Sequence, residues 1–121
     1  MKKRSFLAAL AVSMFAFSSV AFAIDRDVTV HNHIGATVRE LYVSPSSTTS
    51  WGGDLLGADV LRDGGSVLIH YTPRMYRGEC VFDMKIVEQD GTTSTVSGVN
   101  LCTITDVTLN RSGGEVVFDT N

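Results

Sequence analysis

The stretch CVFDMKIV, residues 80–87, decides the fold of this chain. Its side chains alternate in character, with charged Asp83 and Lys85 on one side of an extended chain. The other side holds Cys80, Phe82, Met84 and Ile86. Alternation with a period of two is typical of a β-strand that has one buried and one wet face. The stretch therefore predicts a strand whose apolar face, Cys80 included, points into a core.

Similar short runs lie on both sides of this stretch and are separated by turn signals. Asp90-Gly91 favours a hairpin to the next strand, and Asp63-Gly64-Gly65 favours a turn before an earlier one. The other expected strands cover residues 27–32, 37–43, 66–71, 92–96, 99–102, 106–110 and 115–119. The run 99–102 is either a short strand of its own or a continuation of the strand over 92–96. Helix signals are almost absent, apart from one possible helical turn within residues 51–57. Seven or eight short strands in fewer than 100 residues predict an all-β fold, an antiparallel β-sandwich or an open barrel, and of these we expect the sandwich.

For one of these strands, the sequence also predicts which side chains share a face. In the run 37–43, strict alternation places Leu41 and Val43 on one face and Val38 and Tyr42 on the other.

The first residues predict export from the cytoplasm. Basic side chains at positions 2–4 precede an apolar run over residues 6–17, and Ala21-Phe22-Ala23 has the small-residue pattern of a cleavage site. These are the three parts of a secretory signal peptide. We therefore expect residues 1–23 to be a signal peptide and residues 24–121 to be a single domain, periplasmic or secreted. A transmembrane span is the alternative, but it needs about 20 apolar residues, more than this run supplies.

The mature chain would be small and acidic. Cleavage after Ala23 leaves 98 of the 121 residues, with seven basic side chains against 13 acidic ones and a net charge near −6. That charge disfavours nucleic acid and anionic lipid as partners. We expect no stable membrane anchor in the mature chain, no cofactor, and an envelope protein or a small ligand as the partner.

Cys80 and Cys102 are the only cysteines. An even cysteine count behind a signal peptide favours a disulfide, and the pair lacks the C-x-x-C spacing of redox and metal motifs. Closing a loop of this length stabilises a fold by about 3 kcal/mol in the chain-entropy account. Free thiols and an intermolecular bridge are the alternatives.

Several motifs together resemble a known family. They are LYVSPS at 41–46, WGGDLLG at 51–57, CVFD at 80–83, DG at 90–91 and VNLC at 99–102. The combination resembles a family of small exported proteobacterial proteins of unknown function, often labelled Tat-signal or hypothetical proteins and sometimes argininosuccinate lyase. The resemblance implies no activity. Enzymes of the lyase name are large helical tetramers, and this chain has neither the length nor the helices.

The histidines suggest a metal site. If the first strand extends to His33, the rings of His31 and His33 project from one face about 6 to 7 Å apart. With a third ligand such as His70 or a carboxylate, the pair could bind copper or zinc. Two exposed histidines at a strand end are the alternative. The aspartates Asp54, Asp59 and Asp63 could likewise offer oxygen ligands to calcium, or be ordinary turn residues.

Two loops are candidates for recognition. Trp51, the only tryptophan, follows a Ser/Thr-rich loop and could stack on a sugar ring or anchor a partner, or instead plug one end of the sandwich. The candidate binding residues of this loop and of the loop around Pro73 are Trp51, Asp54, Tyr71, Arg74, Tyr76 and Arg77. The second loop could equally be an ordinary exposed connection.

Signatures of catalysis are missing from the sequence. It contains no G-x-S-x-G and no H-E-x-x-H, and three histidines among many serines permit a triad by chance alone. We therefore expect a non-enzymatic periplasmic binding or interaction module of unknown ligand, which uses the loops 44–56 and 73–79. The alternatives are a periplasmic copper or zinc protein using His31 and His33, and a small hydrolase.

Overall fold

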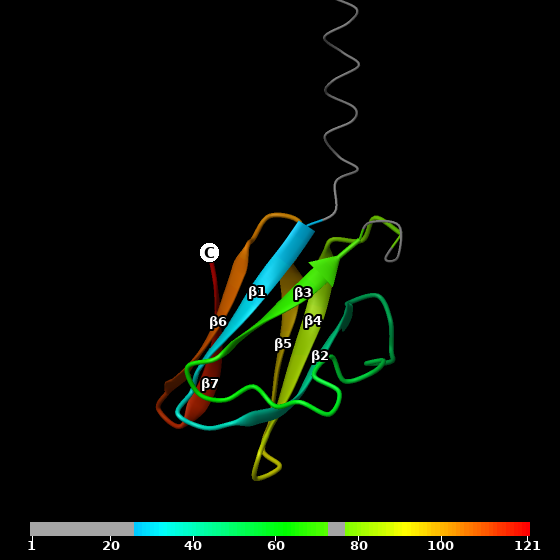
Figure 1. Ribbon diagram of the computed structural model, residues 1–121. Helices are drawn as coiled ribbons and strands as arrows, with labels where there is room; N and C mark the ends of the chain where they lie inside the picture. Colours follow the sequence, from blue (N-terminus) through cyan, green and yellow to red (C-terminus); the bar gives the residue numbers. More distant parts are fainter. Residues whose placement is uncertain (1–25, 73–76) are drawn as a thin grey trace, which may run out of the picture.

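The computed structural model of the chain describes residues 26–72 and 77–121. The predicted signal peptide and the candidate residues Arg74 and Tyr76 lie outside the described residues. The described chain holds seven strands and no α-helix (Figure 1). The strands are β1 (Arg26–His33), β2 (Val38–Pro45), β3 (Ser66–Tyr71), β4 (Val81–Glu88), β5 (Thr93–Asn100), β6 (Asp106–Ser112) and β7 (Glu115–Thr120). The all-β prediction is thus confirmed.

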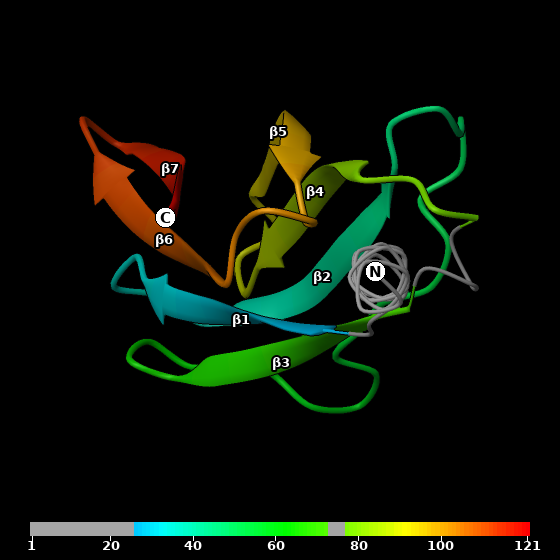
Figure 2. The same cartoon turned by 90° about the horizontal axis from the view of Figure 1, so that it is seen from above.

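The strands form two sheets that enclose the core between them (Figure 2). One sheet has the order β3-β1-β6-β7 and the other the order β2-β4-β5. Every neighbouring pair is antiparallel except β1 and β6, which run parallel. The chain returns to β6 only after it has built the second sheet, so this pair is joined by a long crossover rather than a hairpin. The predicted sandwich is confirmed, with this parallel pair as an exception to its antiparallel pattern.

The decisive stretch forms the centre of the second sheet, as predicted. Phe82, Met84 and Ile86 of β4 are fully buried, whereas Asp83 and Lys85 on the opposite face are half-buried. Val28, Val30, Val107 and Leu109 of the first sheet are also fully buried in the same core. Complete burial of such a side chain stabilises the fold by about 1.5–3 kcal/mol. The alternation in this one strand therefore identified the core correctly.

A bulge in β2 overturns the prediction that Val38 lies on the face opposite Leu41. Both side chains are fully buried. The register with β4 shifts between Val38 and Glu40, so an extra residue enters the strand there. Such an insertion reverses the alternation beyond it. Sequence periodicity predicted the rest of the strand correctly but could not detect the extra residue.

A second irregularity lies within β5. Residues 93–100 form this single strand, so the run that begins at Val99 continues the predicted strand over 92–96, which is one of its two predicted forms. Gly98 has a φ of 77°, and the register with β4 shifts nearby, between Phe82 and Met84. A glycine in this left-handed conformation allows a strand to pass through a bulge and continue.

The disulfide between Cys80 and Cys102 is present, with the two Cα atoms 5.3 Å apart. It closes the end of the β4–β5 hairpin, where the N–H of Leu101 donates to the carbonyl of Cys80 over 2.9 Å. Both cysteines are half-buried at the rim, and Cys80 precedes β4 rather than beginning it. Cys102 packs against the core from this rim, whereas Cys80 is not part of the core cluster. The prediction that Cys80 points into the core was therefore wrong, because the chain reaches the end of the sandwich at this point. Within the described residues, no helix is long and apolar enough to cross a membrane.

Candidate functional site

An aromatic and cationic surface lies on the outer face of the β2-β4-β5 sheet. Tyr42 of β2 and Lys85 of β4 are direct register partners. The Lys85 Nζ lies 4.5 Å from the centroid of the Tyr42 ring and 5.1 Å from that of the Trp51 ring. Such distances are typical of cation–π contacts. We call these three residues the Trp51 platform.

The phenol of the platform is held in place by a carboxylate. The Tyr42 hydroxyl donates a hydrogen bond of 2.5 Å to Oε1 of Glu40, and Arg39 pairs with the same carboxylate through Oε2. This hydrogen bond is the main cause that raises the pKa of Tyr42 above its usual value, because it favours the protonated phenol. The Tyr42 ring is thus a neutral, oriented surface beside the Lys85 ammonium.

The loop before Trp51 is closed by its own hydrogen bonds. The Ser44 hydroxyl donates to the carbonyl of Ser50 over 3.0 Å, and the Thr48 hydroxyl donates to the carbonyl of Pro45 over 2.9 Å. The Ser46 hydroxyl also donates to Oδ1 of Asp83 over 2.6 Å, which ties the loop to β4. These hydrogen bonds therefore fix the conformation of the loop beside the Trp51 platform.

A hollow of about 210 Å³ lies between this loop and the sheet. Its lining consists of Ser44, Thr48, Thr49, Ser50, Trp51 and Asp83. Hydroxyl groups, one carboxylate and an indole thus converge at one place. No salt bridge joins Lys85 to a carboxylate in the part of the chain that the structure describes.

Asp54, predicted as a binding residue and a calcium ligand, is used inside the loop. Its Oδ1 accepts hydrogen bonds from the N–H groups of Leu41 and Leu56, at 2.9 and 3.0 Å. Asp63 likewise accepts from the N–H of Gly35 over 2.9 Å. The bond from the Leu56 N–H, two residues beyond Asp54, is ordinary turn chemistry. The bonds from Leu41 and Gly35 instead join segments that are distant in sequence. Among residues 26–72 and 77–121, no group of three His, Cys, Asp or Glu side chains is arranged to hold a metal ion.

The second predicted loop is only partly described. Tyr71, predicted there as a recognition residue, is instead in the core with 2% of its surface exposed. Its ring packs edge-on against Phe82, and its hydroxyl donates to the carbonyl of Glu79. Arg77 is exposed and adopts a φ of 55° in a turn. Burial removes Tyr71 from any surface that a ligand could reach.

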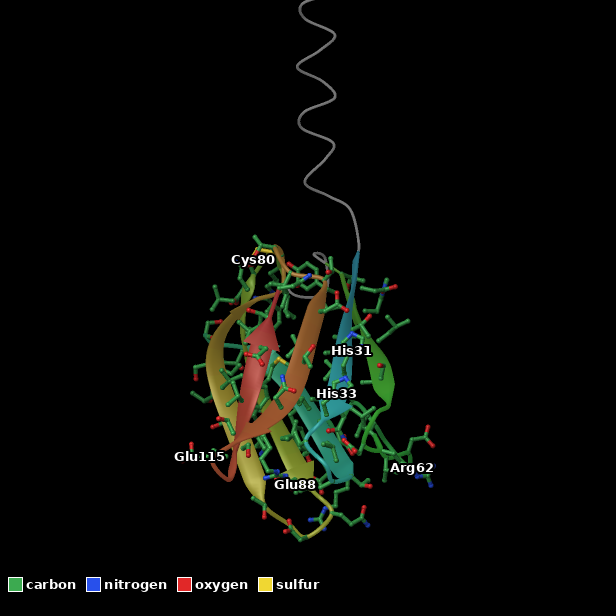
Figure 3. All side chains as sticks on the ribbon, turned by 90° about the vertical axis from the view of Figure 1, so that its left-hand side faces the viewer. His31, His33, Arg62, Cys80, Glu88 and Glu115 are labelled. Carbon is green, nitrogen blue, oxygen red and sulfur yellow. A yellow bond between two sulfur atoms is a disulfide. The ribbon has the colours of Figure 1, made fainter. Side chains whose placement is uncertain are left out.

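The three histidines are not brought together. His31 and His33 both lie on the outer face of β1, as predicted, and Figure 3 labels both on this strand. His70 of β3 is the register partner of Asp27. Asp27 lies four residues before His31 on β1, which places His70 roughly 13 Å from His31 along the strand direction. Its Nδ1 lies 2.6 Å from Oδ1 of Asp27. The described geometry thus gives no support to a copper or zinc site that includes His70.

His31 instead belongs to a hydrogen-bonded array that the sequence did not reveal. Its Nδ1 lies 2.8 Å from Oγ of Ser66, and its Nε2 lies 2.7 Å from Oδ1 of Asp106. The Thr105 hydroxyl donates to the other oxygen of Asp106 over 2.7 Å. The hydrogen bond with His31 is the main cause that lowers the pKa of Asp106. Both ring nitrogens of His31 are therefore already in use.

The serine of this array borders the larger hollow beside β3. That hollow has a volume of about 480 Å³ and is lined by Ser66 together with Leu55, Val60, Arg62 and Val67, among others. Ser66 and Asp106 were missed because they reach His31 only through the pairings of β1 with β3 and β6. No local motif in the sequence reports a contact of that kind.

Comparison with protein-family models, with curated proteins and with solved structures gave no match. The resemblance to the exported proteobacterial family therefore stays a prediction, and the function must be argued from the geometry of the chain itself.

Proposed function

We propose that the mature chain is an exported, periplasmic, non-enzymatic binding module. Its ligand is a hydroxyl-rich ring, such as a sugar residue of an envelope glycan. The ring stacks against Trp51, and its oxygen atoms accept hydrogen bonds from Lys85. The observation that carries this proposal is the Lys85 ammonium, which lies over the rings of both Tyr42 and Trp51.

The chemistry of the surface supports this ligand class. An indole offers a large apolar face together with a polar N–H group, and this suits a ligand with both apolar faces and hydroxyl edges. Around it, Lys85 supplies donors, Asp83 supplies an acceptor, and the hydroxyls of Thr48 and Ser50 can act as either. The loop that carries Trp51 is already fixed by internal hydrogen bonds. Little conformational entropy is therefore lost when a ligand binds.

The direct test is a titration of the mature protein with soluble oligosaccharides released from bacterial envelope glycan, followed by Trp51 fluorescence and calorimetry. We expect saturable binding that shifts the fluorescence. Trp51→Ala should weaken it by about tenfold or more, since buried aromatic anchors dominate binding. Lys85→Gln should weaken it for oligosaccharides with carboxylates more than for neutral ones.

The matched control is Leu68→Ala, which removes an exposed apolar side chain from the other sheet and should leave affinity unchanged. If the oligosaccharides do not bind, or if Trp51→Ala and Leu68→Ala bind equally, the proposed function is wrong.

The array of Ser66, His31 and Asp106 favours a second candidate function, a small esterase. A nucleophile, a base and a group that orients the base lie within hydrogen-bond reach of one another, which is the arrangement of a triad. In the reaction, Ser66 Oγ attacks an ester carbonyl carbon and its proton moves to His31 Nδ1, while Asp106 holds the proton on Nε2. The alcohol leaves with the Nδ1 proton, and water then hydrolyses the acyl-serine.

A fluorophosphonate probe tests the esterase candidate. The candidate predicts a single covalent adduct on Ser66, lost in Ser66→Ala and retained in the control Ser112→Ala. It also predicts ester hydrolysis that disappears in the same variant. An unlabelled protein with no activity on short-chain esters would eliminate it.

A further inference from the structure

One side of the sandwich is open, away from the Trp51 platform. β5 and β7 are the last strands of their sheets and approach each other there, as Figure 2 shows. Within the described residues, neither strand pairs with another along its outer edge. A hollow of about 320 Å³ lies at one end of this side. Its lining includes Glu88 of β4, Arg111 of β6, Glu115 of β7 and the hydroxyl residues Thr93, Ser94 and Thr95.

Glu88 is the unusual residue in this hollow. It is only 5% exposed, although it carries a carboxylate. Its Oε1 accepts a hydrogen bond of 2.8 Å from Nη2 of Arg111, and Nε of Arg111 donates to the carbonyl of Ile34. Its Oε2 is buried and has no hydrogen-bond partner among the described residues. A buried carboxylate oxygen without a donor is costly, so such an atom calls for a partner that supplies one.

The charge of the lining indicates what kind of donor fits. Glu88 and Glu115 contribute two negative charges, and Arg111 is the only basic residue among those that line the hollow. The Arg111 guanidinium is already committed to Glu88 and to Ile34. A net negative lining favours a cation over a neutral donor. The volume also exceeds that of one water molecule, roughly 30 Å³.

We propose that this hollow is a binding site for a primary ammonium group, which donates to the Glu88 carboxylate once the side chain turns its covered Oε2 toward the hollow, while its other N–H groups meet the surrounding hydroxyls. The site is independent of the Trp51 platform, because it lies on the open side between the sheets and shares no residue with it. Figure 3 shows Glu88 and Glu115 near the end of the sandwich opposite Cys80. The ammonium can come from a lysine side chain of a peptide or from a small diamine.

Two probes separate these sources. ¹H–¹⁵N spectra and calorimetry of the mature protein would be recorded with 1,4-diaminobutane and with N-acetyl-lysine-N-methylamide. The norleucine analogue of the second probe, which lacks the ammonium, is the control. We expect amide shifts at Glu88, Ser94 and Arg111, with a Kd on the order of millimolar for such small ligands. Response to both probes indicates a general ammonium site, and response to one alone identifies the source.

Two variants test the role of Glu88. Glu88→Gln keeps an acceptor for Arg111 but replaces the unpaired oxygen with a donor, and it should weaken binding by about tenfold or more. Glu115→Gln, at an exposed position, should weaken it by a smaller factor without affecting folding. The proposal is overturned if neither probe shifts these resonances, if the norleucine analogue binds equally well, or if both variants retain full affinity.

Discussion

At the scale of single residues, a buried amide holds the sandwich together at one corner. Asn32 is fully buried in β1. Its Nδ2 donates to the carbonyls of Ala36 and Leu61, both at 2.9 Å, and its Oδ1 accepts from the N–H of Ile34. One side chain therefore satisfies three backbone groups of two segments that are far apart in sequence.

Replacing this amide should be costly. Asn32→Leu keeps the approximate volume but leaves the N–H of Ile34 and the carbonyl of Ala36 without their partner. We expect the free energy of unfolding in urea to fall by about 2–4 kcal/mol. The control is Asn110→Leu, whose amide donates to the exposed Asp119 side chain and which should cost less than about 1 kcal/mol. Equal losses in the two variants would refute the structural role of Asn32.

Asp106 makes stability depend on pH in a defined direction. Its pKa is lowered in the folded protein, chiefly by the hydrogen bond with His31 and then by the one with Thr105. A carboxyl with a depressed folded pKa stabilises the fold above its unfolded pKa, near 3.8, and this stability is lost as the pH falls through the folded value. We expect the free energy of unfolding of Asp106→Asn to fall less steeply than that of the native protein as the pH drops below about 4. Acid unfolding of both proteins would be followed by circular dichroism. Equal pH dependence of stability in the two proteins would contradict this expectation.

At the scale of elements, β1 shows how one strand serves two purposes. It pairs with β3 on one side and β6 on the other, so its inner side chains Val28, Val30 and Asn32 lie in the core. Its outer side chains lie on the solvent side of the sheet, where His31 meets Ser66 and Asp106. A change in register by one residue would exchange these two sets. The array on the outer face thus depends on the burial of the inner face.

The β4–β5 hairpin is the element that the disulfide secures. Cys80 and Cys102 are separated by 22 positions, so their bond closes a loop around the whole hairpin. We expect the double variant Cys80→Ser/Cys102→Ser to lose about 3 kcal/mol of stability. For a domain of this size, that loss lowers the Tm by roughly 10–25 °C. A thermal melt that is unchanged in the variant, and unchanged by reduction of the native protein, would show that the hairpin does not need the bond.

At the scale of the whole molecule, local patterns were predictable from the sequence and long-range contacts were not. The burial of Phe82, Met84 and Ile86 follows from alternation within one strand, and the disulfide follows from a cysteine count. The bulge at Val38 is a single inserted residue that leaves no mark on composition. The array around His31 leaves no signal in the sequence, because Ser66 and Asp106 lie 35 and 75 positions away from it. The parallel β1–β6 pair that brings Asp106 to His31 is a property of topology rather than of any one segment.

Only part of the candidate site could be predicted from the sequence, because its other residues meet through long-range contacts. Trp51 drew attention as the only tryptophan beside a polar loop, and the structure places it over Lys85. Neither Tyr42 nor Lys85 was predicted to accompany it, because their proximity depends on the pairing of β2 with β4. In the sequence, Glu88 looks like any charged residue at the end of a strand. Only its burial beside Arg111, seen in the structure, distinguishes it.

The proposed function requires that recognition occurs on the outer face of the β2-β4-β5 sheet. The most direct measurement is a ¹H–¹⁵N spectrum of the mature protein recorded during titration with envelope oligosaccharides, since the single tryptophan gives one indole N–H resonance. We predict that this resonance moves together with the amides of Tyr42, Ser50 and Lys85, while those of Leu68 and His31 stay in place. Shifts confined to the β3-β1-β6-β7 sheet, or none at saturating ligand, would contradict the claim.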